Sequence, residues 1–328
     1  MSGAMQYYVA ILLVYAGISI IACWGLDLQF GETGIPNFAF IVFQALGAYT
    51  AAVLTLGKAG NSAVISYQQY VLGFSLPFPI PIVVACIVGA LASFPVGLLA
   101  LRRLRSDYLA IALLVLSLIA TVGAEADVGL VNGSEGLYGI PEPFGGVLSS
   151  IADNWLYVGI TGVAVLLTAL VVRRIVRSPL DRVLRAIRDN EVSAGALGKN
   201  VPAATLATFV VGNTIAAGSG AILVQFIGAW SPSGWEYAET FVYLSAIIIG
   251  GRARRGGVAL GAVLLGVGIS EGVRYLPQFG GPALAGALQF LLIGLLIIGF
   301  LWWRPNGILP ERKRLLVPKE ALRDGSEI

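Results

Sequence analysis

The chain has 328 residues, of which 57% are hydrophobic and 12% charged, and its formal net charge is +3. Soluble domains carry about a quarter charged residues, so this composition excludes an ordinary water-soluble domain. The chain has no histidine, which is the commonest general base and metal ligand, and Cys23 and Cys86 lack partners at metal-ligand spacing. We therefore expect no catalytic residue, no metal site and no cofactor.

Apolar stretches close to the roughly 20 residues that cross a bilayer recur along nearly the whole chain. We predict an all-α fold, a polytopic membrane bundle of eight to ten transmembrane helices over residues 1–310, followed by a polar cytoplasmic tail over 311–328. The seventh expected span is short enough to be a half-helix or a re-entrant segment. The expected spans cover residues 6–26, 37–56, 79–101, 107–125, 154–173, 204–227, 238–251, 257–275 and 284–303.

The basic residues test this layout, because cytoplasmic loops carry an excess of Lys and Arg. With the N-terminus outside, every Lys and Arg except Lys58 and Arg274 falls in a loop or tail on the cytoplasmic side. The opposite loop over 126–153 has acidic residues and no basic one. The predicted topology is multi-pass in the cell membrane, with the N-terminus outside and the C-terminus in the cytoplasm.

The first polar interruption is Leu26–Phe38, with the sequence LDLQFGETGIPNF. Irregular backbone and polar groups persist at membrane depth only where protein or a water-filled path satisfies them. Two interpretations are open for this segment. It is either a discontinuous helix beside a solute path or a cytoplasmic loop with a polar cap.

The longest predicted cytoplasmic stretch, residues 177–202, contains an amphipathic helix over about 178–198. Ser178 and Pro179 are typical of an N-cap and a first helical residue. Apolar residues then recur at helical spacing among charged ones, and Gly198 and Pro202 end the pattern. This helix lies either on the lipid headgroups, which its arginines favour, or against a cytoplasmic partner.

The predicted outer segment over 131–141, VNGSEGLYGIP, is rich in glycine and lacks basic residues. This composition favours a structured loop that meets a soluble extracytoplasmic partner. No GxxxxGK[ST] phosphate loop occurs in the chain, so any nucleotide energy has to come from a separate protein.

Several stretches together resemble a known family. In chain order they are LDLQFGETGIPNF, QALGAYTAAVL, LRSDYLAIALLVLSL, VNGSEGLYGIP, SPLDRVLRAIRDNEVSAGALGKNV and IIGGRARRGGVALGAVLLGVGISEGVRYLP. They resemble the branched-chain amino acid ABC-transporter permeases of the LivH/LivM family, and the LivM type in particular. The resemblance covers most of residues 26–310 and is most specific at Ser178–Val201, where relatives have sequences close to SPLGRALRAIRDNEVAARALGINV.

The resemblance implies the membrane-spanning permease subunit of an ABC importer, which is not itself an enzyme. The implied partners are a second, LivH-like permease, two cytoplasmic ATPase subunits, an extracytoplasmic solute-binding protein and the lipid bilayer, with no nucleic acid. The resemblance implies that the amphipathic helix is a coupling helix that docks on an ATPase. The residues that match the family pattern there are Arg185, Arg188, Asp189, Asn190, Glu191 and Gly198. The candidate residues for lining the solute path are Gln29, Thr33, Asn37 and Gln44.

The solute class has alternatives. Members of the family import leucine, isoleucine and valine, while others transport urea, short amides or further amino acids. The chain departs from the family pattern near Asn37 and at Glu135, so branched-chain or related amino acids are the first expectation and urea or amides the alternative. An ion-coupled secondary transporter is a weaker rival, since the apolar spans offer few ionisable groups beyond Glu125, Glu271 and Arg274.

Overall fold

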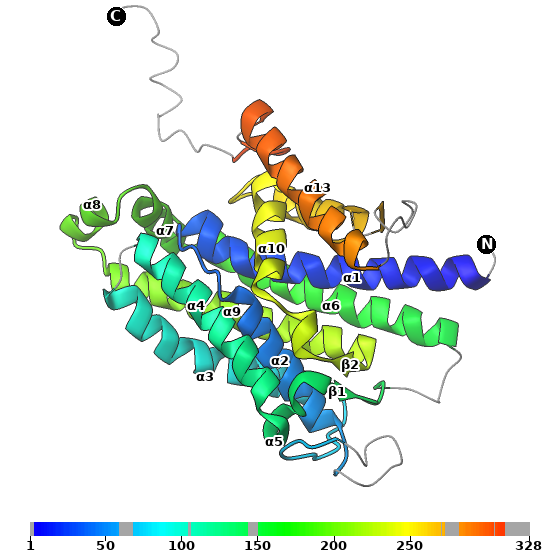
Figure 1. Cartoon of the computed structure of the whole chain (residues 1–328). Coiled ribbons are helices and arrows are strands. Elements are labelled where there is room, and N and C mark those ends of the chain that lie inside the picture. The colour runs from blue at the N-terminus through cyan, green and yellow to red at the C-terminus, as the bar shows by residue number, and fades with distance from the viewer. Residues whose placement is uncertain are drawn as a thin grey trace, which may run out of the picture.

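The computed structural model describes residues 3–58, 68–103, 106–143, 150–269, 271–272, 282–304 and 306–311. This part of the chain is an all-α bundle with one very short β-ribbon, and each predicted span overlaps a helix. The main helices are α1 (Gly3–Asp27), α2 (Phe40–Thr55), α3 (Ile80–Arg103), α4 (Ser106–Ala126), α6 (Ser150–Arg177), α9 (Val201–Ile227), α10 (Tyr237–Gly250), α11 (Arg255–Val263) and α13 (Pro282–Trp303) (Figure 1).

Five helical segments are long and apolar enough to cross a membrane by length and composition. They are Ala4–Glu32, Ile80–Leu101, Tyr108–Ala126, Ala152–Arg177 and Val201–Ile227, and shorter apolar helices cover Phe40–Thr55, Arg255–Ile269 and Leu288–Trp303. Large apolar side chains on the outside of the bundle are exposed, among them Leu91, Leu99, Ile119 and Trp302. An apolar outer surface of this extent fits a lipid surrounding. The chain is a polytopic helical membrane protein.

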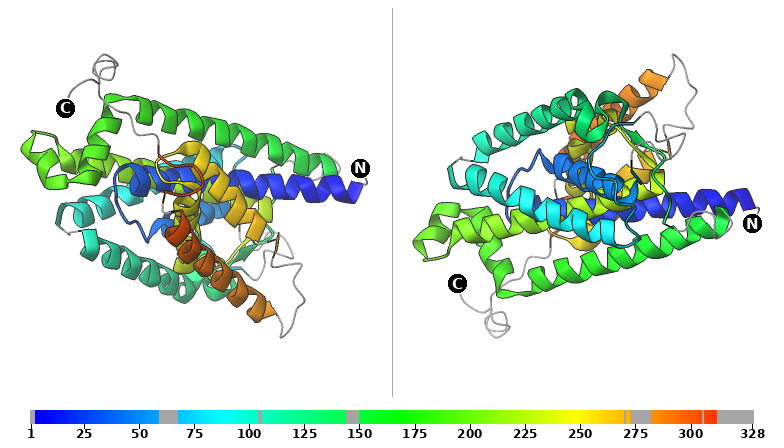
Figure 2. Two further views of the ribbon diagram at one scale, coloured as in Figure 1. Left: turned by 90° about the horizontal axis from the view of Figure 1, so that it is seen from above. Right: turned by 90° about the horizontal axis from the view of Figure 1, so that it is seen from below.

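The centre of the bundle is the crossing of α2 and α9. A Cβ atom added to Gly47 would overlap the backbone of Ala217, and one added to Gly220 would overlap the carbonyl of Gln44. Small residues at such a crossing let two helix backbones touch, which is the usual basis of close packing inside membranes. Around this crossing, α6 lies along α1, and α3 and α4 lie on a different side of α9 from α6 (Figure 2).

Two of the helices change to π-helical geometry. The helix α1 continues as η1 (Leu28–Glu32), and α11 continues as η4 (Leu264–Ile269). Residues 34–37 have no regular structure before α2 begins at Phe40. The polar interruption predicted at Leu26–Phe38 is therefore a π-helical end followed by an irregular turn, and π-helical turns are frequent at functional sites. Residues 273–275, at the end of the eighth predicted span, lie outside the described residues.

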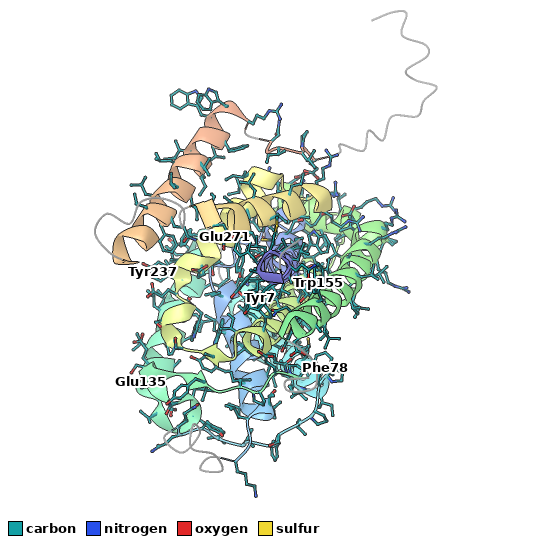
Figure 3. All side chains as sticks on the ribbon, turned by 90° about the vertical axis from the view of Figure 1, so that its right-hand side faces the viewer. Tyr7, Phe78, Glu135, Trp155, Tyr237 and Glu271 are labelled. Atoms are coloured by element: carbon teal, nitrogen blue, oxygen red, sulfur yellow. The ribbon has the colours of Figure 1, made fainter. Side chains whose placement is uncertain are left out.

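One end of the molecule, here called the β end, carries α5 (Val128–Val131), η2 (Gly133–Glu135) and η3 (Pro232–Gly234). It also carries strands β1 (Leu137–Tyr138) and β2 (Ala229–Trp230), which pair in an antiparallel ribbon with Leu137 opposite Trp230. The stretch predicted as a structured loop over 131–141 forms α5, η2 and β1. Figure 3 looks onto this end, where Glu135, Trp155 and Tyr237 are labelled.

The opposite end, here called the α7 end, carries the stretch predicted as one helix over 178–198. It forms two helices, α7 (Pro179–Asp189) and α8 (Glu191–Ala196), which extend beyond the bundle (Figure 1). The single-helix prediction is corrected at Asn190, where the backbone is extended with φ −160° and ψ 105°.

Candidate functional site

The caps of α7 and α8 explain why this segment is a helix pair. The backbone N–H of Leu180 donates to Ser178 Oγ at 3.2 Å, and Pro179 occupies the first turn. Asn190 ends α7 and caps α8, since its Oδ1 accepts from the backbone N–H of Ser193 at 2.9 Å. A side chain that caps one helix start cannot also continue the preceding helix, so the segment bends at this residue.

The apolar face of α7 packs on the protein itself. Leu184 and Ile187 are buried against Ala194 of α8 and against Val201 and Ala204 of α9. An interpretation in which this helix lies on lipid headgroups would need the same face for lipid. The packing therefore argues for a helix pair that the protein itself supports.

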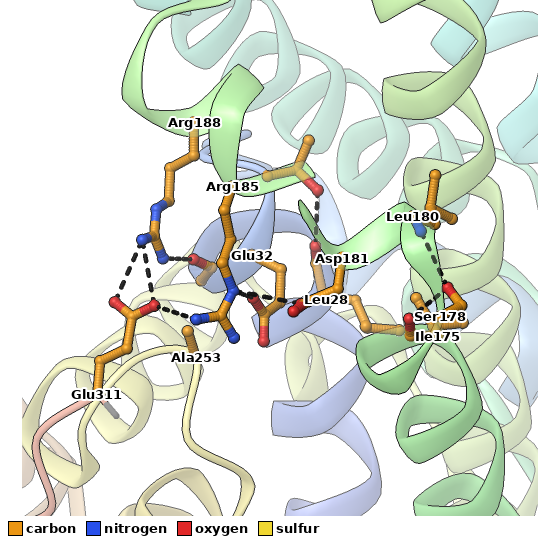
Figure 4. A network of polar contacts seen from close by, with 12 residues as sticks. Leu28, Glu32, Ile175, Ser178, Leu180, Asp181, Arg185, Arg188, Ala253 and Glu311 are labelled. Atoms are coloured by element: carbon orange, nitrogen blue, oxygen red, sulfur yellow. Dashed lines mark hydrogen bonds and ion pairs between the residues drawn. The ribbon is translucent and has the colours of Figure 1, made fainter. Parts of the chain in front are cut away.

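Two arginines of α7 join it to other parts of the chain through ion pairs (Figure 4). Arg185 Nε lies 3.2 Å from Glu32 Oε2 and 3.3 Å from Asp181 Oδ1, and its Nη1 lies 2.8 Å from Glu311 Oε1. Arg188 Nη2 lies 3.2 Å from Glu311 Oε2. We call these five side chains the α7 charge cluster.

The charge cluster connects α7 to the π-helical end of α1 and to residues 306–311. Arg188 also donates through Nη1 to the carbonyl of Gly31 at 2.6 Å. Burial works against the charge on Arg185, but the carboxylates of Glu32, Asp181 and Glu311 outweigh it and raise the pKa of Arg185. The guanidinium stays cationic, and its ion pair with Glu32 links α7 to η1.

The six predicted coupling residues have different surroundings. Arg185 and Arg188 point into the charge cluster, whereas Asp189, Asn190, Glu191 and Gly198 are exposed. Gly198 has φ +73°, a backbone conformation that favours glycine. The most exposed apolar side chains here, Val192 at 82% and Leu197 at 77%, were not singled out from the sequence.

Two of the predicted path residues meet in a buried polar network. Asn37 Nδ2 donates to Gln29 Oε1 at 2.7 Å and to Asn213 Oδ1 at 2.9 Å, and Gln29 Nε2 donates to Asn213 Oδ1 at 3.1 Å. The backbone N–H of Ala39 donates to Asn37 Oδ1 at 3.0 Å. All three amide side chains are fully buried, so in this structure they hold η1, the turn before α2 and α9 together.

The other two predicted path residues lie apart from this network. Thr33 Oγ1 donates to the carbonyl of Leu28 at 3.0 Å and borders a cavity of about 230 Å³ that Arg188 and Glu191 also line. Gln44 is fully buried on α2 where that helix crosses α9 at Gly220. The structure thus brings Thr33 close to the coupling segment and leaves Gln44 in the packed centre.

Sequence reasoning missed Asp181, Glu32 and Glu311 as partners of the arginines. Asp181 and Arg185 are four residues apart on one helix, a spacing that predicts an ion pair. Glu311 is separated from Arg185 by 126 positions, and nothing local in the sequence points to it. Asn213 was missed for the same reason, because it lies within an apolar helix far from Gln29.

Comparisons with known proteins agree with this architecture. Residues 8–301 match the family described as the permease component of the branched-chain amino acid transport system. The chain is 27% identical over 332 residues to the high-affinity branched-chain amino acid transport system permease protein LivM of Salmonella typhimurium, covering 94% of this chain and 72% of the relative.

Two further relatives extend the likeness. A probable LivM permease of Methanocaldococcus jannaschii is 25% identical, covering 94% of this chain and 95% of the relative. The LivH permease of Salmonella typhimurium is 24% identical, covering 88% and 91%. No solved structure gave a significant match. The chain belongs to the family of branched-chain amino acid transport permease components.

Proposed function

We propose that the chain is the membrane-spanning permease subunit of an ABC importer for branched-chain or related amino acids. The observation that carries this proposal is the α7–α8 pair, which extends from the bundle, exposes Val192 and Leu197, and is anchored to α1 through Arg185 and Arg188. A bundle that transports solute unaided has no evident use for such an anchored protrusion.

The proposed mechanism is alternating access. Closure of two partner ATPase subunits displaces α7 and α8, and the charge cluster passes the displacement to η1 and hence to α1. In this proposal the chain supplies the path and the ATPase subunits supply the energy, because the sequence contains no phosphate loop. The second permease forms the other half of the path, and a soluble binding protein delivers the solute.

Reconstitution tests this function. The full-length chain is placed in proteoliposomes with its partner permease, its ATPases and its binding protein, and uptake of labelled leucine is measured with and without ATP. We expect uptake only with ATP and the ATPases. Leucine uptake that needs an ion gradient, or that proceeds without ATPases, would contradict the importer proposal and would indicate a secondary transporter. Stimulation of ATP hydrolysis by urea or acetamide and not by leucine would favour the amide alternative.

Docking by α8 has its own test. Glu191→Lys together with Gly198→Val changes an exposed charge and strains a left-handed backbone, so we expect loss of ATPase co-purification with the bundle intact. Glu142→Lys, an exposed charge change at the β end, is the matched control. If the double variant still retains its ATPases and full ATP-dependent uptake, α8 is not the docking site.

A further inference from the structure

A cavity of about 570 Å³ lies at the α7 end, beside the charge cluster. It is bordered by η1, α10 and α13, the last two of which lie next to each other (Figure 1). One wall is apolar and is formed by Phe30, Ile248 and Leu301. The opposite rim is polar and includes Arg252, Asn306 and Glu311.

The polar rim is held in place by the chain that follows α13. Residues 306–311 run against the end of α10, where the N–H of Ile308 donates to the carbonyl of Ile249 at 2.8 Å. Gly307 has φ +73°, and a Cβ atom there would come within 2.6 Å of the backbone nitrogen of Gly251. Because backbone contacts fix this segment, the cavity is a defined feature of the fold.

The charge that the cavity offers to a ligand is positive. Arg252 is exposed, and its guanidinium forms no ion pair or hydrogen bond with any described residue. The carboxylate of Glu311 is compensated, since the two arginines of the charge cluster bind it at 2.8 and 3.2 Å (Figure 4). Arg254 adds a second positive charge at the rim, where its Nη1 donates to the carbonyl of Pro310 at 3.1 Å.

The same combination of apolar wall and arginine recurs on the outer surface of α13. A groove of about 560 Å³ there is lined by apolar residues and by Arg304, which directly follows the helix. Trp302 and Trp303 beside it are 83% and 85% exposed. Tryptophan side chains are enriched where a bilayer meets water, so this end of α13 lies at the level of the lipid headgroups.

We propose that the cavity binds the headgroup of an anionic phospholipid from the leaflet at the α7 end. Arg252 binds the phosphate group, and the side-chain amide of Asn306 donates to a second headgroup oxygen. The apolar wall takes the glycerol backbone and the start of an acyl chain. An unpaired guanidinium beside an apolar wall at headgroup level matches both parts of such a lipid, whereas a soluble phosphate would leave the apolar wall unused.

Native mass spectrometry of the purified full-length chain tests the proposal, in detergent with equal amounts of phosphatidylglycerol and phosphatidylcholine. The two lipids carry the same acyl chains and differ in headgroup charge, which is negative only in phosphatidylglycerol. We expect bound phosphatidylglycerol to exceed bound phosphatidylcholine by at least about fivefold, the factor that one arginine contributes near an anionic lipid. Glycerol phosphate at the same concentration should not displace the lipid.

Four variants locate the binding site. Arg252→Gln should lower the preference for phosphatidylglycerol by about fivefold or more, and Arg252→Lys, which keeps the charge, should retain part of it. Arg174→Gln is the matched control, because Arg174 is an exposed arginine in the last turn of α6 that does not line the cavity. Leu301→Trp fills the cavity from its exposed wall and should weaken binding without changing any charge. Thermal unfolding confirms that each variant is folded.

Each contrary outcome overturns a specific part of the proposal. Equal binding of the two lipids, or an equal loss in Arg174→Gln and Arg252→Gln, would mean that anionic lipids are attracted only unspecifically to a basic surface. Displacement of the lipid by glycerol phosphate would identify a site for soluble phosphates. Unchanged binding in Leu301→Trp would place the lipid outside the cavity. Because these measurements use neither ATP nor partner proteins, they leave the importer function to its own test.

Discussion

Arg185 is the residue on which the α7 end depends most. It faces two nearly buried carboxylates, with side-chain exposures of 3% for Glu32 and 4% for Asp181, and one more exposed carboxylate, Glu311 at 24%. Removing one partner of a buried ion pair leaves an uncompensated charge and costs about 3–5 kcal/mol, whereas solvent-exposed pairs contribute roughly 0–1 kcal/mol. The two ends of the cluster should therefore respond very differently to substitution.

Arg185→Met keeps most of the side-chain volume and removes the charge beside Glu32 and Asp181. We expect the free energy of unfolding in detergent to fall by about 3–5 kcal/mol. Glu311→Gln, at the half-buried end of the same cluster, should cost clearly less, because water reaches this carboxylate more easily than it reaches Glu32 or Asp181. Chemical unfolding followed by tryptophan fluorescence measures both, and equal losses in the two variants would contradict the assignment of Arg185 as the central cation.

Asn37 is the second residue whose partners determine its role. Asn37→Leu conserves volume but removes the donor to Gln29 Oε1 and the acceptor of the Ala39 N–H, while Gln29 Nε2 still donates to Asn213 Oδ1. Each buried polar group left unpaired costs about 1–3 kcal/mol, so a clear drop in unfolding temperature is expected. Thr214→Val is the control, since Thr214 Oγ1 bonds only within its own helix. An unchanged unfolding temperature in Asn37→Leu would mean that water enters the network.

The sequence alone identified Gln29 and Asn37 as polar residues between apolar stretches. Polar side chains inside a membrane are costly, so such residues are candidates for a functional role. Their partner was beyond prediction, because Asn213 lies 184 positions from Gln29 in a helix with no other sign of pairing. The ion-pair partners of Arg185 and Arg188 could not be predicted for a similar reason. Helical spacing tells which face a residue occupies, but not which distant carboxylate approaches that face.

At the scale of elements, the α2–α9 crossing is the contact that positions the rest. Gly47→Ala places a methyl group against the backbone of Ala217, so α2 and α9 would have to move apart to accommodate it. Overpacking of this kind costs about 1–3 kcal/mol. Gly162→Ala on α6, where no atom lies within 4 Å of the added carbon, should be neutral or slightly stabilising. Thermal unfolding of the two variants distinguishes them, and a neutral Gly47→Ala would contradict the close crossing.

Apolar length predicted the positions of the helices well, because a bilayer of fixed thickness imposes one length on every crossing segment. It did not predict how they are interrupted. At the change of α1 to η1, Asp27 Oδ1 accepts from the N–H of Ala253 at 3.0 Å, a contact between distant parts of the chain that apolar length does not reveal. The break between α7 and α8 was in principle visible, since Asn190 is a favourable N-cap, but the continuing charge pattern masked it.

At the scale of the whole molecule, the two ends differ in chemistry. The α7 end carries the arginines of α7 and of the segment before α11, whereas the β end has acidic residues such as Glu135 and Glu239. Cytoplasmic surfaces of membrane proteins are enriched in Lys and Arg. This polarity is the physical basis for the proposed orientation, with the β end outside the cell and α7 inside.

Cysteine labelling tests that orientation directly. Ser134→Cys and Val192→Cys each place a thiol at an exposed position, one at the β end and one on α8, in a background where Cys23 and Cys86 are replaced by Ala. A membrane-impermeant maleimide should label the Ser134 position in intact cells and the Val192 position only after permeabilisation. Labelling of Val192 from outside would overturn both the orientation and the docking of ATPases on α8, because the ATPases act from the cytoplasm.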